Sequence, residues 1–402
     1  MRIEPNDEDA GVIFDTINGK TTPLRQFDHL RNSIFIRMPT RQGPFLKRHW
    51  EPAEAALAHV SYSSLRNQPQ DQFLYEYLIS LGETSTTTGT LHRVFMERVI
   101  EKIGFDVTGD SERKFESQFA VPLAREAQLY PLAVGVRTST RIAGKEIALP
   151  AAEAVLIADL MALSGGPPVP LVLRYLRSWE VGKLTNVELR ARLMLIQSFV
   201  VRMMLHGDNL SPLRAGFISI AGSLPDDSDE SLELALKQHG WRADRDIVDS
   251  VATVSLTGHY SSAAVMVVLR GIERQLSGRG AHAVPFGKGE ELFSIEHVLP
   301  QAQDPGRAWR QDLDKWGEPV DLPSSQELRH TLGNLTAVTN YDNSVNGQKP
   351  FSVKRGLIAK TAPLRLHSSF KRRQKWTSKE IVERTQALAV AALAHWRGPR
   401  QR

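Results

Sequence analysis

The chain has 402 residues, which is long enough for two or three domains. Of these residues 41% are hydrophobic and 24% are charged, as is typical of globular proteins. It contains no cysteine, which excludes disulfides, thiolate zinc sites and a cysteine nucleophile. The acidic N-terminal segment lacks the apolar core of a signal peptide, and no apolar run is long enough for a membrane span. We therefore expect a cytoplasmic protein that does not enter the membrane.

The net charge of +5 is unevenly distributed along the chain. Residues 345–402 contain 14 Lys and Arg against two Glu, a net charge of +12, so that residues 1–344 carry −7. A basic end on a mildly acidic body is typical of a protein that contacts nucleic acid with one end. A generic basic tail is the alternative. Phosphate contacts from such an end would give affinity without sequence specificity.

Residues 45–280 are predicted to be mainly helical, because apolar side chains recur there at helical spacing. A long helix is predicted to be capped by Asn186 and to run through Leu205. A polar loop is predicted around Arg137, Arg141 and Lys145, either solvated or in contact with DNA.

The segment 292–355 has a different character. Phe293 to Leu299 is predicted to form a short strand with His297 near its end, and Leu335 to Thr339 a second strand. Asn343 to Ile358 is predicted to form a helix that is broken early by Pro350. Between the strands lies an insertion whose tryptophans, Trp309 and Trp316, are predicted to pack rather than to stack on bases.

The order strand, loop, strand, helix with His, Asn and Asn is that of a ββα-metal nuclease core, also called HNH or His-Me finger. In that chemistry a neutral histidine takes a proton from the water that attacks a phosphodiester. One divalent metal neutralises charge on the phosphate and on the leaving oxygen. An asparagine orients the imidazole through its other nitrogen and thereby fixes the tautomer.

Three motifs carry a resemblance to a known family. Glu-His-Val-Leu-Pro-Gln at 296–301, Leu-Gly-Asn-Leu-Thr at 332–336 and Pro-Phe-x-x-Lys at 350–354 resemble the C-terminal nuclease domain of GmrSD-type restriction endonucleases, which are modification-dependent type IV enzymes. Phosphorothioate-dependent defence nucleases of the Ssp type carry a similar domain.

The resemblance implies roles for individual residues. His297 would be the general base, Asn334 the orienting asparagine and Asn343 a catalytic metal ligand. Glu296 stands where many relatives have a metal-binding acid, and Asn346 is a second candidate ligand on the same helix. The metal would be one Mg²⁺ or Mn²⁺, because the ligands are oxygens. Contacts to the nucleic acid are expected from Lys349, Lys354, Arg355, Lys371, Arg372, Arg373 and Lys375.

A structural interpretation of the same residues competes with these roles. In it, Glu296 belongs to a salt bridge, His297 is a core histidine, and Asn334 and Asn343 are turn and cap residues.

Segment 12–38 resembles the end of the ParB-like N-terminal domain of the same family. The Asp-Gly-x-Gln-Arg motif of that domain and a P-loop are both missing from the sequence. Together, the predicted elements and the resemblance indicate a mainly α chain. We expect the tail of a ParB-like domain at 1–40, a helical domain at 41–280, and an HNH-type nuclease domain with a basic C-terminal helix at 281–402. A separate NTPase subunit is an expected partner.

The expected function is metal-dependent DNA cleavage or nicking in modification-dependent restriction, an anti-phage defence. Two alternatives stay open. One is a non-catalytic DNA-binding partner that needs a separate NTPase subunit, and the other is an RNA-directed toxin nuclease.

Overall fold

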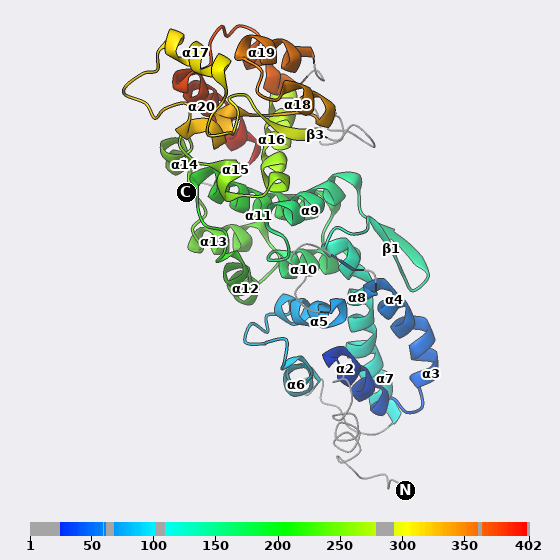
Figure 1. Cartoon of the computed structure of the whole chain (residues 1–402). Coiled ribbons are helices and arrows are strands. Elements are labelled where there is room, and N and C mark those ends of the chain that lie inside the picture. The colour runs from blue at the N-terminus through cyan, green and yellow to red at the C-terminus, as the bar shows by residue number, and fades with distance from the viewer. Residues whose placement is uncertain are drawn as a thin grey trace. The chain divides into compact units, whose positions relative to one another are not determined.

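The computed structural model in Figure 1 describes residues 25–58, 60–61, 68–100, 109–278, 293–360 and 364–399. Over these ranges the chain is mainly helical, as predicted. None of the described helices is long and apolar enough to cross a membrane. Most of the predicted ParB-like tail and the last basic residues lie outside the described residues.

The chain divides into two compact units. Unit 1 comprises Met1–Leu149, Gly166–Thr185 and Phe217–Ser223, and unit 2 comprises Pro150–Gly165, Asn186–Gly216 and Leu224–Arg402. This division does not fall at residue 280, because helices that precede that residue pack into unit 2. The predicted domain limits stay a prediction.

Unit 1 is built from short helices around aromatic side chains. Trp50 is 1% exposed and packs its indole against Phe27 and Phe45, and Tyr130 meets Phe73 edge-on. Its helices are α2 (Gln26–Ile36), α3 (Gln42–Phe45), α4 (Glu51–Leu57), α5 (Pro69–Ser80), α6 (Leu91–Val94), α7 (Gly109–Phe115), α8 (Val121–Ala133) and α10 (Val169–Glu180). Among the described residues of this unit, π-helical segments lie between these helices at Leu46–Trp50, Phe95–Ile100 and Glu116–Ala120.

A β-hairpin stands where the sequence predicted only a polar loop. Strand β1 (Ser139–Ile142) pairs antiparallel with β2 (Lys145–Ala148), which places Arg141 and Lys145 on strands. Ala143 and Gly144 form the turn with φ of +50° and +82°. Two positive φ angles are typical of the tight turn that joins two antiparallel strands. Because Arg141 and Lys145 lie on paired strands, the loop prediction was wrong. The strands were missed because each has only four residues.

Unit 2 contains a helical layer and the segment singled out by the motifs (Figure 1). Helix α11 (Asn186–His206) matches the predicted long helix, and it packs on α9 (Ala151–Ser164). The buried Asp159 joins α9 to α16 (Ser262–Ser277), because Arg270 and Arg274 donate to it at 2.6 and 3.2 Å. The further helices of this layer are α13 (Asp229–Gln238), α14 (Asp244–Ser250), α15 (Leu256–His259), α16 (Ser262–Ser277) and α20 (Ser378–His395); α12 (Leu213–Ser223) begins here and continues into the residues of unit 1.

The two predicted strands are both present and pair with each other. Strand β3 (Phe293–His297) runs antiparallel to β4 (Leu335–Thr339), with Glu296 opposite Thr336. Helix α18 (Asn340–Asn346) follows at once, because the Thr339 hydroxyl accepts from the backbone N–H of Asp342 and caps it.

The predicted helix over 343–358 is two helices in the structure. Helix α18 ends at Asn346, and its C-cap Gly347 has a φ of +47°. Helix α19 (Phe351–Lys360) begins just after Pro350. The insertion between the strands forms α17 (Arg307–Trp316) and the 3₁₀ turns Glu327–His330 and Leu332–Asn334.

One hydrophobic cluster supports this segment. Trp309 is fully buried beside Phe351, and Trp376 stacks on the same phenyl ring at 5.2 Å. Trp316 packs against the cluster from its edge. The prediction that both tryptophans of the insertion serve packing is confirmed.

Candidate active site

A pocket of about 310 Å³ in unit 2 brings together four of the predicted site residues. Glu296, His297, Asn343 and Lys354 all line it. Their positions come from strand β3 and from helices α18 and α19, which follow the second strand. The segment Pro300–Ala302 and residues 347–348 complete the wall.

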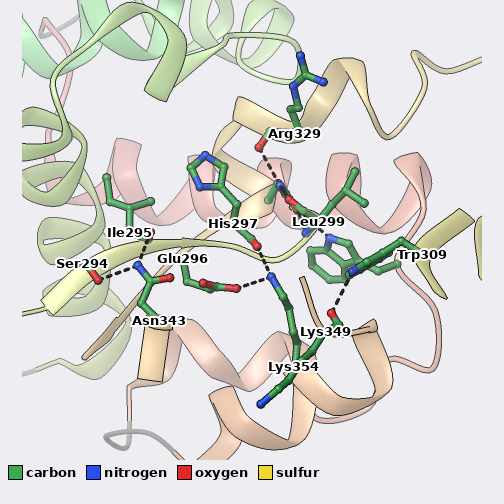
Figure 2. Close-up of polar contacts among 12 residues, drawn as sticks. Ser294, Ile295, Glu296, His297, Leu299, Trp309, Arg329, Asn343, Lys349 and Lys354 are labelled. Atoms are coloured by element: carbon green, nitrogen blue, oxygen red, sulfur yellow. Dashed lines mark hydrogen bonds and ion pairs between the residues drawn. The ribbon is translucent and has the colours of Figure 1, made fainter. Parts of the chain in front are cut away.

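Glu296 and His297 point to opposite faces of β3, because successive side chains of a strand alternate. Figure 2 shows Glu296, Asn343 and Lys354 below the strand and the His297 ring above it. The side chains of these two adjacent residues therefore lie in different environments at the end of β3.

Glu296 forms a buried ion pair. Its Oε1 lies 2.6 Å from Nζ of Lys354, which also donates to the backbone carbonyl of His297 at 2.8 Å. Burial raises the pKa of the Glu296 carboxyl and lowers the pKa of the Lys354 ammonium, while the charge of each partner opposes both shifts. The salt-bridge interpretation of Glu296 therefore describes its contact in this structure.

Lys354 was predicted to contact phosphate, yet its side chain is only 1% exposed. The ammonium is turned inward to β3, as Figure 2 shows. A direct phosphate contact would require it to leave both of its acceptors. In this structure Lys354 instead fixes the end of the strand that carries the histidine.

His297 lies in a partly buried cluster on the other face. Its Nε2 is 3.1 Å from Oγ1 of Thr257, and its ring meets that of His330 edge-on at 5.4 Å. Burial, the neighbouring His330 and the Lys354 charge lower the pKa of His297 to about 4. The imidazole is therefore neutral at pH 7, the state that a general base requires.

Asn334 is fully buried in a 3₁₀ turn just before β4, not on the strand. Its Oδ1 accepts from the Leu299 N–H at 2.8 Å and from Trp376 Nε1 at 3.0 Å. Its Nδ2 donates to the carbonyls of Leu299 and Arg329 at 2.9 and 2.7 Å. Within the described ranges it makes no hydrogen bond with the His297 imidazole, so the predicted direct contact is not made. Its amide instead fixes the loop that follows the histidine.

Asn343 and Asn346 are placed differently, although both belong to α18. Nδ2 of Asn343 donates to Ser294 Oγ at 2.8 Å and to the Ile295 carbonyl at 3.2 Å, which ties the helix to β3. Asn346 is fully buried, does not line the pocket, and its amide has no partner within the part of the chain that the structure describes. The pocket therefore favours Asn343 over Asn346 as a ligand.

The oxygen donors in the pocket suit a hard cation. The carboxylate of Glu296 and the amide oxygen of Asn343 are the ligand types that Mg²⁺ and Mn²⁺ prefer. Among the described residues, no group of three or more His, Cys, Asp or Glu could hold a metal. A cation bound here would compete with Lys354 for Glu296, whose carboxylate is the only one among the described residues that line the pocket.

The predicted nucleic-acid contacts fall into two groups. Arg355 donates to the Arg373 carbonyl at 2.6 Å, and Arg373 pairs with Glu383 at 3.0 Å. These two guanidinium groups are engaged within the protein. Apart from the buried Lys354, the other predicted residues are exposed or half-buried: Lys349, Lys371, Arg372 and Lys375.

Sequence reasoning missed Thr257 and His330, which flank the imidazole of His297. Thr257 lies 40 positions before the histidine and had no local signal. His330 precedes the Leu-Gly-Asn-Leu-Thr motif closely in sequence, and this proximity was the only available indication.

The comparison with known families bears on this same part of the chain. Residues 243–391 match the family described as GmrSD restriction endonucleases, C-terminal domain. The predicted resemblance is therefore confirmed for the C-terminal region. This GmrSD-like region, residues 243–391, covers just over a third of the chain and contains His297, Asn334 and Asn343. No curated protein matches the chain.

The limits of the GmrSD-like region agree with the packing of unit 2. The region begins upstream of the predicted boundary at 281 and includes α15 and α16 as well as both strands. Thr257 is thus part of the region that carries the site.

Proposed function

We propose that the GmrSD-like region is an HNH-type, metal-dependent DNA endonuclease with His297 as its general base. The observation that carries the proposal is the pocket that gathers Glu296, His297, Asn343 and Lys354 from three elements. The insertion separates β3 in sequence from α18 and α19, and all four residues lie within the GmrSD-like region.

The order of the elements supports an HNH-type core. Strand β3 carries the histidine at its end, β4 pairs with it antiparallel, and α18 follows directly with Asn343 on it. This is the strand, strand, helix order of a ββα-metal nuclease.

The residues of the chain account for the first half of the reaction. Neutral His297 takes a proton from water, and the water oxygen attacks the phosphodiester. Lys354 holds the backbone of His297, and Asn334 holds the following loop, so the base has a fixed position. A bound Mg²⁺ or Mn²⁺, held by Glu296 and Asn343, would neutralise charge on the scissile phosphate.

DNA is the substrate that an endonuclease of this family implies, and the exposed lysines and arginines after residue 345 are suited to its backbone. We infer a role in modification-dependent restriction, an anti-phage defence, with a separate NTPase subunit as partner. That assignment rests on the family.

The first test is cleavage of supercoiled plasmid by the purified chain with Mg²⁺, with Mn²⁺ or with EDTA. We expect nicking or cutting with either metal, none with EDTA, and none with His297→Ala. His259→Ala is the matched control, because His259 is exposed and belongs to the same unit. Equal cleavage by wild type and His297→Ala would overturn the proposal.

The two alternatives correspond to other outcomes of the same assay. A chain that cleaves only after addition of an NTPase subunit with the Asp-Gly-x-Gln-Arg motif would be a split enzyme. Preferential cleavage of RNA, with harm to the expressing host, would indicate a toxin.

A further inference from the structure

The hydroxyl of a threonine outside the β3–β4 sheet contacts two histidine side chains. Thr257 lies on α15, and its Oγ1 is 3.1 Å from Nε2 of His297 and 2.8 Å from Nδ1 of His330. The two rings are nearly perpendicular, at 84°. One hydroxyl therefore contacts the proposed base and a second imidazole at the same time.

The neighbour of His330 fixes the direction of one of these hydrogen bonds. Arg329 Nε, which is always a donor, points at Nε2 of His330 at 3.3 Å. Burial and the Arg329 charge lower the pKa of His330, which keeps its ring neutral at pH 7. The single ring proton is then on Nδ1, and Nδ1–H donates to Thr257 Oγ1.

The two nitrogens of His297 differ in access. Nε2 faces Thr257, and His330 lies against the same ring. Nδ1 makes no hydrogen bond within the described residues. It is also not one of the solvent-inaccessible polar atoms that lack a partner there. Since a water must reach the base, Nδ1 is the nitrogen that can accept its proton. Nε2 then carries the ring proton.

We propose that Thr257, which is itself held by a hydrogen bond with His330, is a positioning residue for His297. Its hydroxyl oxygen has two lone pairs, one for Nε2–H of His297 and one for Nδ1–H of His330. Thr257 is partly exposed, so its own hydrogen can reach solvent. The contact holds the imidazole in the Nε2–H tautomer and leaves Nδ1 open.

This inference rests on the proposed function and assigns the proton path. The proton of the attacking water passes to Nδ1 while the water oxygen bonds to phosphorus. The bond from phosphorus to the leaving oxygen breaks, and that oxygen takes a proton from solvent. The imidazolium keeps its Nε2–H contact with Thr257 throughout.

The tautomer is measured on the resting protein, independently of cleavage. Long-range ¹H–¹⁵N spectra distinguish the two neutral forms of a histidine, and the His297 signal is identified by its loss in His297→Asn. We expect the Nε2–H form in wild type and in Thr257→Ser, and a mixture of tautomers in Thr257→Val, which lacks the hydroxyl. An Nδ1–H form in wild type, or an unchanged tautomer in Thr257→Val, would overturn the inference.

Cleavage kinetics test the consequence. Loss of a group that orients a functional histidine typically costs about 10- to 100-fold. We expect that loss in kcat for Thr257→Val with KM unchanged, near wild-type rates for Thr257→Ser, and a smaller loss for His330→Phe. Thr253→Val, an exposed threonine of the same unit, is the control for an unspecific effect.

The two proposals fail in different ways. Full activity of Thr257→Val beside an inactive His297→Ala would remove the positioning role and leave the nuclease. Full activity of His297→Ala would remove the nuclease assignment, whereas the tautomer measurement would still decide whether Thr257 holds the ring. Thermal melting of each variant checks that it is folded.

Discussion

Lys354 Nζ lies 2.6 Å from Oε1 of Glu296, although the two residues are 58 positions apart. The contact joins α19 to β3, and both side chains are at most 4% exposed. A residue expected to bind metal and a residue expected to bind phosphate thus neutralise each other in this structure. The same ammonium holds the carbonyl of His297, so the pair also fixes the proposed base.

Removal of one partner of this pair should destabilise unit 2 strongly. Lys354→Met leaves the Glu296 carboxylate buried without its partner, a change that typically costs about 3–5 kcal/mol. Urea denaturation would measure the loss as a lower free energy of unfolding. Because the His297 carbonyl also loses its donor, we expect weaker cleavage at temperatures where the variant is folded.

Two further variants identify the cause. Lys354→Met combined with Glu296→Gln removes both charges and should recover part of the lost stability. Glu383→Gln breaks the pair with Arg373, in which the glutamate is 47% exposed, and should cost less than about 1 kcal/mol. Equal losses for the buried and the exposed pair would contradict the burial argument.

Gly333 should tolerate no side chain. A Cβ there would lie 2.0 Å from the carbonyl oxygen of Ile381 and 2.3 Å from Oγ1 of Thr385, both on α20. Overpacking of this kind costs about 1–3 kcal/mol, so Gly333→Ala should lower the thermal midpoint. Displacement of the backbone at Gly333 would also move Asn334, the next residue, and should weaken cleavage.

A second glycine gives the opposite expectation. Gly356 lies inside α19, where an added Cβ would meet no atom within 4 Å. Gly356→Ala should therefore stabilise the protein by about 0.5–1 kcal/mol through helix propensity. A loss of stability in Gly356→Ala similar to that in Gly333→Ala would show that contact with α20 is not the cause.

The sequence was sufficient to predict the parts of the site that depend on local pattern. The strand that ends at His297 and the strand at Leu335–Thr339 follow from β-forming runs between turn residues. The interactions that set the chemistry could not be predicted in this way. Thr257 and Lys354 reach the histidine from 40 and 57 positions away, and only tertiary packing brings them there. The contacts of Asn334 could not be predicted for the same reason, because its amide bonds the backbone of Leu299 and the indole of Trp376, both distant in sequence.

Mild acid should destabilise the protein through its buried histidines. Burial and the nearby Arg274 lower the pKa of His395 to about 4, from 6.5 in the unfolded chain. Between these values the unfolded state binds more protons, so stability falls as the pH drops from 6.5 and levels off below about 4. A shift of this size corresponds to about 3 kcal/mol.

Urea denaturation at about pH 7 and about pH 5 would measure this effect. His297, with its pKa also lowered to about 4, should contribute in the same direction. His395→Asn should therefore reduce the pH dependence without abolishing it. An unchanged pH dependence in this variant would mean that His395 is charged in the folded protein.

The exposed basic side chains after α19 should govern affinity for DNA. Lys371 and Arg372 are exposed, and Lys375 is half-buried, whereas the neighbouring Arg373 is paired with Glu383. Each phosphate contact contributes about 0.9 to the slope of log affinity against log salt. Replacement of Lys371, Arg372 and Lys375 by Gln should therefore weaken binding of any duplex sequence and lower that slope by up to about 3.

Fluorescence anisotropy with a labelled duplex at several salt concentrations would measure both quantities. Arg245→Gln is the matched control, because its side chain is 89% exposed in the same unit and lies outside the basic end. It should leave the slope nearly unchanged. A triple variant whose slope equals that of the wild type would show that the basic end does not contact the phosphates, and the generic-tail interpretation would then hold.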